Sequence, residues 1–93
     1  MMRLVTEVLG DEPYQYYPLG THVVRALGVC GGRPTFKYTR VEITGTLERL
    51  AAGEPVEQIV TGYAGRISLD ALQEASQIMT SYFLRALPEL HAA

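Results

Sequence analysis

The hydrophobic pattern of this chain changes its period once, and that change divides the 93 residues into two parts. Before residue 43, β-branched and aromatic runs separated by glycine and proline predict extended chain. From Thr44 onward, apolar residues recur at intervals of three and four, which is the spacing of an amphipathic helix. Residues 30–43 join the two parts. The chain is therefore expected to fold as a small β segment followed by a helical body.

Two strands are expected around the glycine pair Gly31 and Gly32. Residues 21–27 are compact and β-branched, and residues 35–43 alternate with period two. The double glycine supplies a turn, so the two strands are predicted to form a hairpin-like ribbon. Residues 3–9 alternate weakly and are a candidate for a further short strand. A two-stranded ribbon is marginal alone, so it must pack on the helices or pair across a dimer.

Three helices are predicted from their caps and stops. The first starts at a Thr44 cap and ends at Gly53, the second starts at Pro55 and ends near Gly62 or Gly65, and the third runs from a Ser68 cap to Pro88. One face of the third helix carries an apolar stripe, which consists of Leu72, Ala75, Met79, Tyr82, Phe83 and Ala86. The expected fold class is mainly α with a short β segment.

A chain of this length forms one domain, whose core is thin enough that oligomerisation is expected. We place the domain at residues 28–88, after an extension at residues 1–27 and before a tail at residues 89–93. A single cysteine, Cys30, excludes an internal disulfide framework and fits a reducing compartment. The amino terminus does not resemble a signal peptide and no run suits a membrane span, so a cytoplasmic protein is expected.

The charge of −2 is unevenly distributed along the chain. Residues 25–40 carry four basic side chains and no acid, whereas residues 42–93 carry seven acids and three arginines. This asymmetry suggests either a polar assembly surface or a local site for an anion.

The third helix offers two residues that could contact DNA, Gln73 and Gln77, because glutamine can read adenine in the major groove. Asp70 and Glu74 lie beside them and would oppose phosphate. The helix is therefore expected to serve in packing or dimerisation rather than in recognition.

The strand at residues 35–43 is the preferred contact with DNA or with a protein partner. Arg33, Lys37 and Arg40 would reach phosphate or guanine from it. The competing interpretation is that these cations pair with acidic residues within the fold or on a partner.

Four aromatic residues could line a cleft for a small molecule: Tyr14, Tyr16, Tyr17 and Phe36. The simpler interpretation is that the tyrosines lie flat over the core or over a partner subunit, with their hydroxyl groups in water.

The residues for catalysis or metal binding are too few. His22 and Cys30 do not make up the three or four ligands that zinc requires, and His91 lies in the tail. No phosphate loop is present, because the glycines precede a strand and lack the lysine and serine or threonine that end that motif. We therefore expect no enzyme activity, no metal and no cofactor.

The order of short motifs resembles a known family. The motifs are Gly31-Gly32-Arg33-Pro34, Thr39-Arg40-Val41, Leu50 to Gly53, Pro55 to Ile59, Tyr63, and Ser68 to Ala75. Together they cover residues 29–78 and resemble domain-of-unknown-function family 433. The resemblance implies a tri-helical, homeodomain-like helix-turn-helix after a short β segment, with residues 62–67 as the turn. Many relatives are regarded as VapB-like antitoxins, encoded beside a PIN-like nuclease that they neutralise.

Two features depart from the family pattern. Tyr38 stands where the family has glycine before threonine-arginine, and the extension lies outside the match. The leading hypothesis is a non-enzymatic, dimeric antitoxin-like protein that binds a PIN-like toxin. The alternatives are a DNA-binding autoregulator acting on operator DNA, and a structural dimer or small-molecule sensor.

Overall fold

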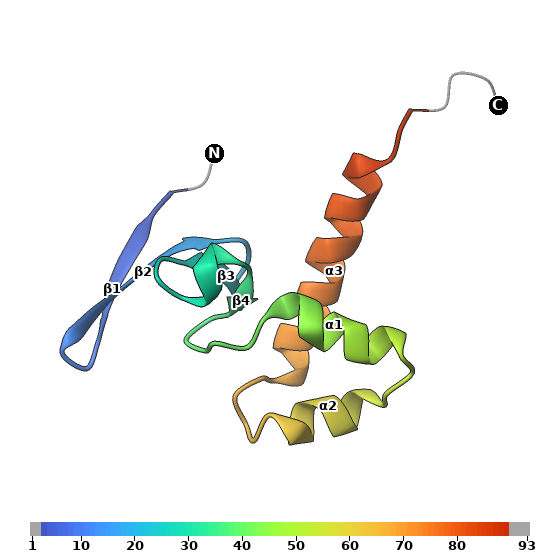
Figure 1. Ribbon diagram of the computed structural model, residues 1–93, viewed down its shortest axis with the longest axis horizontal. Coiled ribbons are helices and arrows are strands. Elements are labelled where there is room, and N and C mark those ends of the chain that lie inside the picture. Colours follow the sequence, from blue (N-terminus) through green and yellow to red (C-terminus); the bar gives the residue numbers. More distant parts are fainter. Residues whose placement is uncertain (1–2, 90–93) are drawn as a thin grey trace.

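The computed structural model describes residues 3–89 and places a sheet beside three helices (Figure 1). The elements in chain order are β1 (Val5–Leu9), β2 (Glu12–Pro18), β3 (Val23–Ala26), a short 3-10 helix η1 (Cys30–Gly32), β4 (Thr35–Phe36), α1 (Ile43–Ala51), α2 (Val56–Gly62) and α3 (Leu69–Ala86). The carboxyl-terminal half of α3 projects from the body, and the β1–β2 hairpin lies at the opposite side of the molecule (Figure 1). Within residues 3–89, no helix is both long and apolar enough to span a membrane.

The sheet has four antiparallel strands in the order β1-β2-β3-β4, so the expected two-stranded ribbon was wrong. The sequence analysis missed the strand that contains Tyr14, Tyr16 and Tyr17, which is β2 and pairs with β1 on one side and β3 on the other. Leu9 pairs with Glu12, which leaves Gly10 and Asp11 as a two-residue turn, and Gly10 takes a φ of 63° that suits glycine. No strand was predicted for this segment, which has proline near both ends, although its tyrosines favour a strand.

The predicted strand at residues 35–43 was also wrong beyond Phe36, because the chain turns back on itself. The backbone amide of Phe36 donates to the carbonyl of Val41 at 3.1 Å. Thr39 Oγ1 donates to the carbonyl of Phe36 at 2.8 Å and accepts from the amide of Val41 at 3.0 Å. These bonds hold a tight turn, and the period-two pattern could not distinguish that turn from a continuous strand.

The three helices lie close to their predicted positions. The Ser68 cap of α3 is confirmed, since its hydroxyl accepts from the amide of Ala71 at 3.1 Å. The cap of α1 is different: the helix begins at Ile43, one residue before the predicted Thr44, and no side chain caps it. The homeodomain-like description of these helices stays a prediction.

Two apolar clusters cover the two faces of β3, and the larger one holds the sheet to the helices. The main core consists of Val23, Phe36, Ile43, Ile59, Ile67, Ala71, Leu72 and Ala75. A smaller cluster consists of Tyr16, Val24 and Ala26. Neighbouring residues of a strand point to opposite faces, so Val23 faces the helices and Val24 faces the second cluster.

A polar contact also joins α3 to the turn between β2 and β3. The half-buried carboxylate of Glu74 accepts from the backbone amides of Thr21 at 2.9 Å and His22 at 2.6 Å. Gly20 lies against this contact, because a Cβ there would meet the Glu74 carboxylate carbon at 2.7 Å. Glu74 therefore has a structural role and faces the sheet, so it is not placed to oppose phosphate as expected.

Candidate functional site

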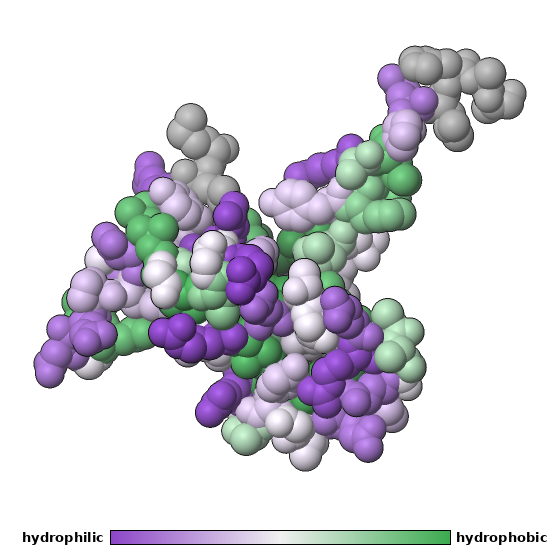
Figure 2. Space-filling model, viewed as in Figure 1, coloured by the Kyte–Doolittle hydropathy of each residue, from purple (hydrophilic) through white to green (hydrophobic). Residues whose placement is uncertain are grey.

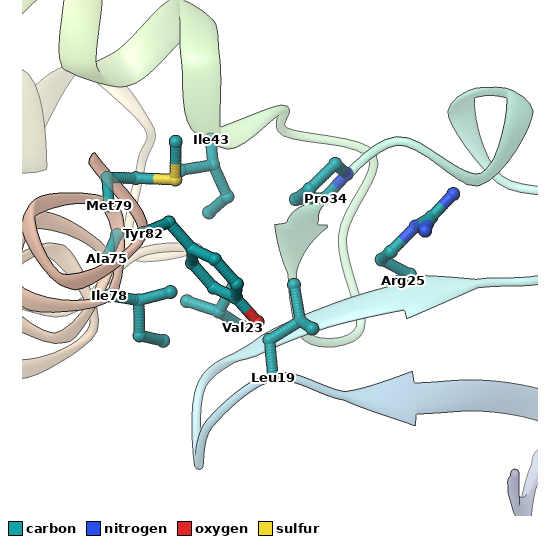
Figure 3. Close-up of a pocket in the computed structure, with 9 residues that line it drawn as sticks. All are labelled: Leu19, Val23, Arg25, Pro34, Ile43, Ala75, Ile78, Met79 and Tyr82. Carbon is teal, nitrogen blue, oxygen red and sulfur yellow. The ribbon is translucent and has the colours of Figure 1, made fainter. Parts of the chain in front are cut away.

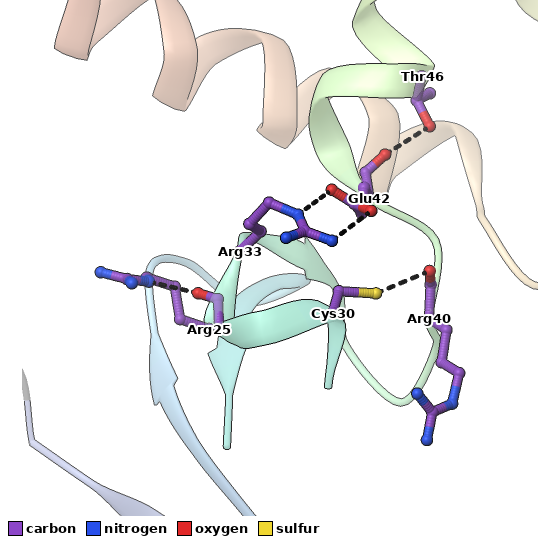
Figure 4. A network of polar contacts seen from close by, with 7 residues as sticks. Arg25, Cys30, Arg33, Arg40, Glu42 and Thr46 are labelled. Atoms are coloured by element: carbon purple, nitrogen blue, oxygen red, sulfur yellow. Dashed lines mark hydrogen bonds and ion pairs between the residues drawn. The ribbon is translucent and has the colours of Figure 1, made fainter. Parts of the chain in front are cut away.

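Arg33, one of the predicted contact residues, is engaged within the fold. Its guanidinium donates to both carboxylate oxygens of Glu42, at 2.7 and 3.2 Å, and so links η1 to the start of α1 (Figure 4). The hydrogen bonds and charge of Arg33 lower the pKa of Glu42, which therefore stays ionised. The alternative of an internal ion pair is thus the one realised for Arg33.

Arg40 behaves differently, because only its backbone takes part in this network. The thiol of Cys30 donates to the carbonyl of Arg40 at 3.3 Å, while the Arg40 side chain extends away from the other residues (Figure 4). The residue is exposed, and within residues 3–89 no carboxylate forms a salt bridge with it. Its charge is available to a partner.

Lys37 lies between two tyrosine rings and one carboxylate. Its Nζ is 4.9 Å from the ring centroid of Tyr16, 5.0 Å from that of Tyr38, and 3.3 Å from Oε2 of Glu7. The Tyr16 and Tyr38 hydroxyl groups and the Glu7 carboxylate together raise the pKa of Lys37. Lys37 therefore remains charged at any ordinary pH, but Glu7 offsets part of its field.

Tyr38 explains both departures from the family pattern. Its φ of 67° lies in the left-handed region that favours glycine. Its amide donates to the Tyr14 hydroxyl at 2.9 Å, its hydroxyl donates to Glu7 at 2.6 Å, and its ring centroid lies 5.3 Å from that of Tyr14. Contacts from the β1–β2 hairpin thus hold a tyrosine in a conformation that glycine adopts more readily, so the extension and Tyr38 form one feature.

The predicted four-ring cleft does not form. Tyr14 and Tyr16 are neighbours, with ring centroids 5.2 Å apart, but Phe36 is buried in the main core. Tyr17 follows Tyr16 along β2 and therefore faces the other side of the sheet. The sequence analysis missed Glu7 and Tyr38 as partners of these rings. Tyr38 at a glycine position was the available signal.

Three basic residues line a hollow that lies between the turn after β4 and the turn before α3. Its volume is about 460 Å³, and it is lined by Lys37, Tyr38, Thr39, Arg40 and Arg66. A neighbouring hollow shares Lys37, Tyr38 and Arg66 and extends to Ser68, the cap of α3. Among the described residues, neither lining contains an acid. We call this surface the basic hollow.

The basic hollow suits a phosphate group on electrostatic grounds. Arg40 and Arg66 contribute two positive charges, Lys37 adds a third that Glu7 partly offsets, and the amino end of an 18-residue helix adds a partial positive charge that Asp70 in its first turn reduces. The sequence analysis missed Arg66, because it lies 26 positions after Arg40 and only the fold brings the two together.

Gln73 and Gln77 lie apart from the basic hollow. They border a separate groove between α3 and the other two helices, together with Leu50, Val56, Leu69, Leu72 and Ser76. The acidic residues of α3 oppose DNA less than the sequence analysis expected. Glu74 points inward, and only Asp70 remains exposed in the first turn.

The part of the chain that the structure describes contains no group of three or more histidine, cysteine or acidic residues placed to hold a metal ion. His22 is half-buried, and its amide donates to Glu74. His91 lies outside the described residues.

Comparison with known proteins supplies one result. Residues 23–77 match the family described as "Protein of unknown function (DUF433)". No curated protein matches the chain. No solved structure matches it either. The matched residues run from β3 to the middle of α3, so they include η1, β4 and the first two helices but neither the β1–β2 hairpin nor the projecting end of α3. They make up more than half of the chain, which therefore belongs to the DUF433 family.

Proposed function

We propose that the protein is a non-enzymatic, dimeric antitoxin-like protein of a bacterial toxin–antitoxin pair, which holds a PIN-like toxin and binds its operator DNA. The observation that carries the proposal is the basic hollow at the amino end of α3. The toxin partner rests on the resemblance of the family to VapB-like antitoxins.

The DNA-binding part follows from the charges of the basic hollow. Phosphate neutralisation by lysine and arginine supplies most of the sequence-independent affinity of a protein for DNA. Arg40 and Arg66 are exposed, and both lie at the same end of α3. They would contact the backbone and set the register of the protein, while exposed residues of the first turn of α3, such as Asp70, would face the bases.

The protein-binding part has support from the β1–β2 hairpin, which lies outside the residues shared with the family. β1 is one of the two edge strands of the sheet, and within residues 3–89 no other strand pairs with its outer side. Val8 on this strand is 72% exposed. A free edge strand with exposed apolar residues is a template for strand addition by another protein.

The proposal of a toxin partner is tested by co-expressing the protein with the product of the adjacent gene. The wild-type protein should relieve its growth arrest and co-elute with it in gel filtration. Val8→Lys should abolish both effects, because a lysine on an edge strand disfavours strand addition. Leu27→Lys is the matched control, since Leu27 is also exposed (51%) but lies after β3. If the wild-type proteins do not co-elute and growth arrest persists, the toxin proposal is wrong.

DNA binding is tested by retention of the protein's own promoter fragment over a series of salt concentrations. Arg40→Ala and Arg66→Ala should each weaken binding and lower the salt slope by about one, as expected for one lost phosphate contact. Arg33→Ala should change the slope little, because Arg33 already pairs with Glu42. Wild-type protein that shows no salt-sensitive retention at low ionic strength would exclude this function.

The structure gives no support to the alternative of a small-molecule sensor, because the four aromatic rings do not line one cleft. Phe36 and Tyr17 are turned away from the other two rings, as described above.

A further inference from the structure

The apolar stripe of α3 continues past the end of the protein core. Ala71, Leu72 and Ala75 are buried on one face of the helix. At 100° per residue, Tyr82, Phe83 and other apolar residues further along continue the same face. Yet Tyr82 is 48% exposed and Phe83 is 64% exposed. We call the exposed continuation the α3 strip, and it consists of Met79, Tyr82, Phe83 and Ala86. Figure 2 shows apolar residues along this projecting arm.

An apolar groove lies at the base of the α3 strip. It has a volume of about 370 Å³ and is lined by Leu19, Val23, Arg25, Pro34, Ile43, Ala75, Ile78, Met79 and Tyr82. Figure 3 shows Tyr82, Ile78 and Met79 reaching from α3 toward Leu19, Val23 and Ile43. Among the described residues, Arg25 is the single charged member of the lining. Its Nε donates to the carbonyl of Gly32 at 2.7 Å, which leaves the two terminal nitrogens to other acceptors.

We propose that the α3 strip and this groove are the interface with a second copy of the chain. The two α3 helices pack antiparallel about a twofold axis near Met79 and Tyr82, and the end of each helix lies in the groove of the other copy. This inference rests on the dimer of the proposed function and assigns its interface.

Charge complementarity identifies the occupant as a second copy. The carboxyl end of α3 carries the negative pole of an 18-residue helix, and Glu89 follows it. Arg85, the one cation of the last turn, lies back over the ring of its own Tyr82, 5.5 Å from the ring centroid. The antiparallel arrangement brings this negative end toward the groove whose charged member is Arg25. Met79 and Tyr82 belong to both the strip and the groove, as a self-complementary twofold interface requires.

The projecting end of α3 also needs a partner for its stability. From Met79 onward, every helical residue is exposed, so about two turns of helix gain little support from the core beyond the contacts of Met79 and Tyr82 at the groove. Isolated helical segments of this length are marginal in water, and helices in proteins are stabilised mainly by packing of an apolar face.

The experiment is sedimentation equilibrium of the full chain over a concentration series. The wild type should be a dimer, and Phe83→Asp should raise the dimer dissociation constant about 30-fold or more, as for an interface hot spot. Leu84→Asp is the matched control: Leu84 is 61% exposed on the same turn but lies on the other face of the helix. Leu84→Asp should remain a dimer. Circular dichroism should show that both variants stay folded and that a monomeric Phe83→Asp loses no more than the two projecting turns of helix.

A charge reversal tests the orientation of the two helices. Arg25→Glu and Glu89→Arg should each weaken the dimer, and the double variant should recover most of the wild-type affinity. A wild-type protein that is monomeric throughout the series would overturn the inference, as would equal effects of Phe83→Asp and Leu84→Asp. If the double variant does not recover the dimer affinity that the single variants lose, the antiparallel arrangement is wrong.

The outcomes separate this inference from the proposed function. If Phe83→Asp leaves the dimer intact but abolishes co-elution with the toxin, the α3 strip belongs to the toxin interface and the inference is wrong. If the wild type dimerises through the strip but binds neither toxin nor DNA, the inference stands and the proposed function fails.

Discussion

Glu74 is the residue whose removal tests the described packing most directly. Its carboxylate accepts from the amides of Thr21 and His22, and it is the side chain that ties α3 to the turn between β2 and β3 by hydrogen bonds. Glu74→Ala removes both acceptors and leaves two backbone amides at a half-buried position. The contact joins residues more than 50 positions apart, so only the folded state contains it.

The magnitude follows from these two bonds. A hydrogen bond to a charged group contributes about 1.5–3 kcal/mol, and partial exposure of this site brings the pair to about 2–3 kcal/mol in total. For a domain of this size, a loss of that amount lowers the melting temperature by about 10–20 °C. Glu74→Gln retains one acceptor oxygen without the charge, and it should fall between the wild type and Glu74→Ala.

The assay is urea unfolding followed by circular dichroism, at one fixed protein concentration because association would raise the apparent stability. Glu74→Ala should lower the midpoint at an unchanged m-value. Glu48→Ala is the control, since Glu48 is an exposed helical glutamate on α1, and it should change the free energy of unfolding by no more than about 0.5 kcal/mol. Equal costs for the two variants would refute the described contact between α3 and the sheet.

Three further predictions concern the hairpin and the core. Tyr38→Gly should keep the turn, because its φ of 67° suits glycine, but amide exchange in the β1–β2 hairpin should become faster as the hydroxyl bond to Glu7 and the ring contact with Tyr14 are lost. Hydrogen bonds from the hydroxyl groups of Tyr16 and Tyr38 lower the pKa of Glu7, so its stabilising effect is present above its ordinary pKa and is lost as pH falls through the lower folded value. Acid unfolding should therefore depend less on pH in Glu7→Gln. Ile59→Ala should cost about 2–5 kcal/mol in urea unfolding, because Ile59 is completely buried.

Much of the helical body could be predicted from local pattern. Ser68 caps α3, Gly53 follows α1 with a φ of 89°, and Leu72 and Ala75 of the α3 stripe lie in the core. Helical periodicity and caps depend on residues three or four positions apart, so a single sequence contains them. The strands were predicted less well, because pairing joins residues whose separation no local pattern records. No strand was predicted at residues 12–18, where β2 forms, and the alternating run at residues 35–43 extended β4 too far.

The candidate site shows the same division. The sequence by itself determined that basic residues are concentrated between residues 25 and 40, and that Tyr38 occupies a glycine position. Only the tertiary structure decided which of these charges are free: Arg33 is paired with Glu42, Lys37 is partly offset by Glu7, and Arg40 meets Arg66 in the basic hollow. Chemical type and local period are properties of the chain alone. Whether a charge is paired or exposed depends on contacts between residues distant in sequence, and those exist only after folding.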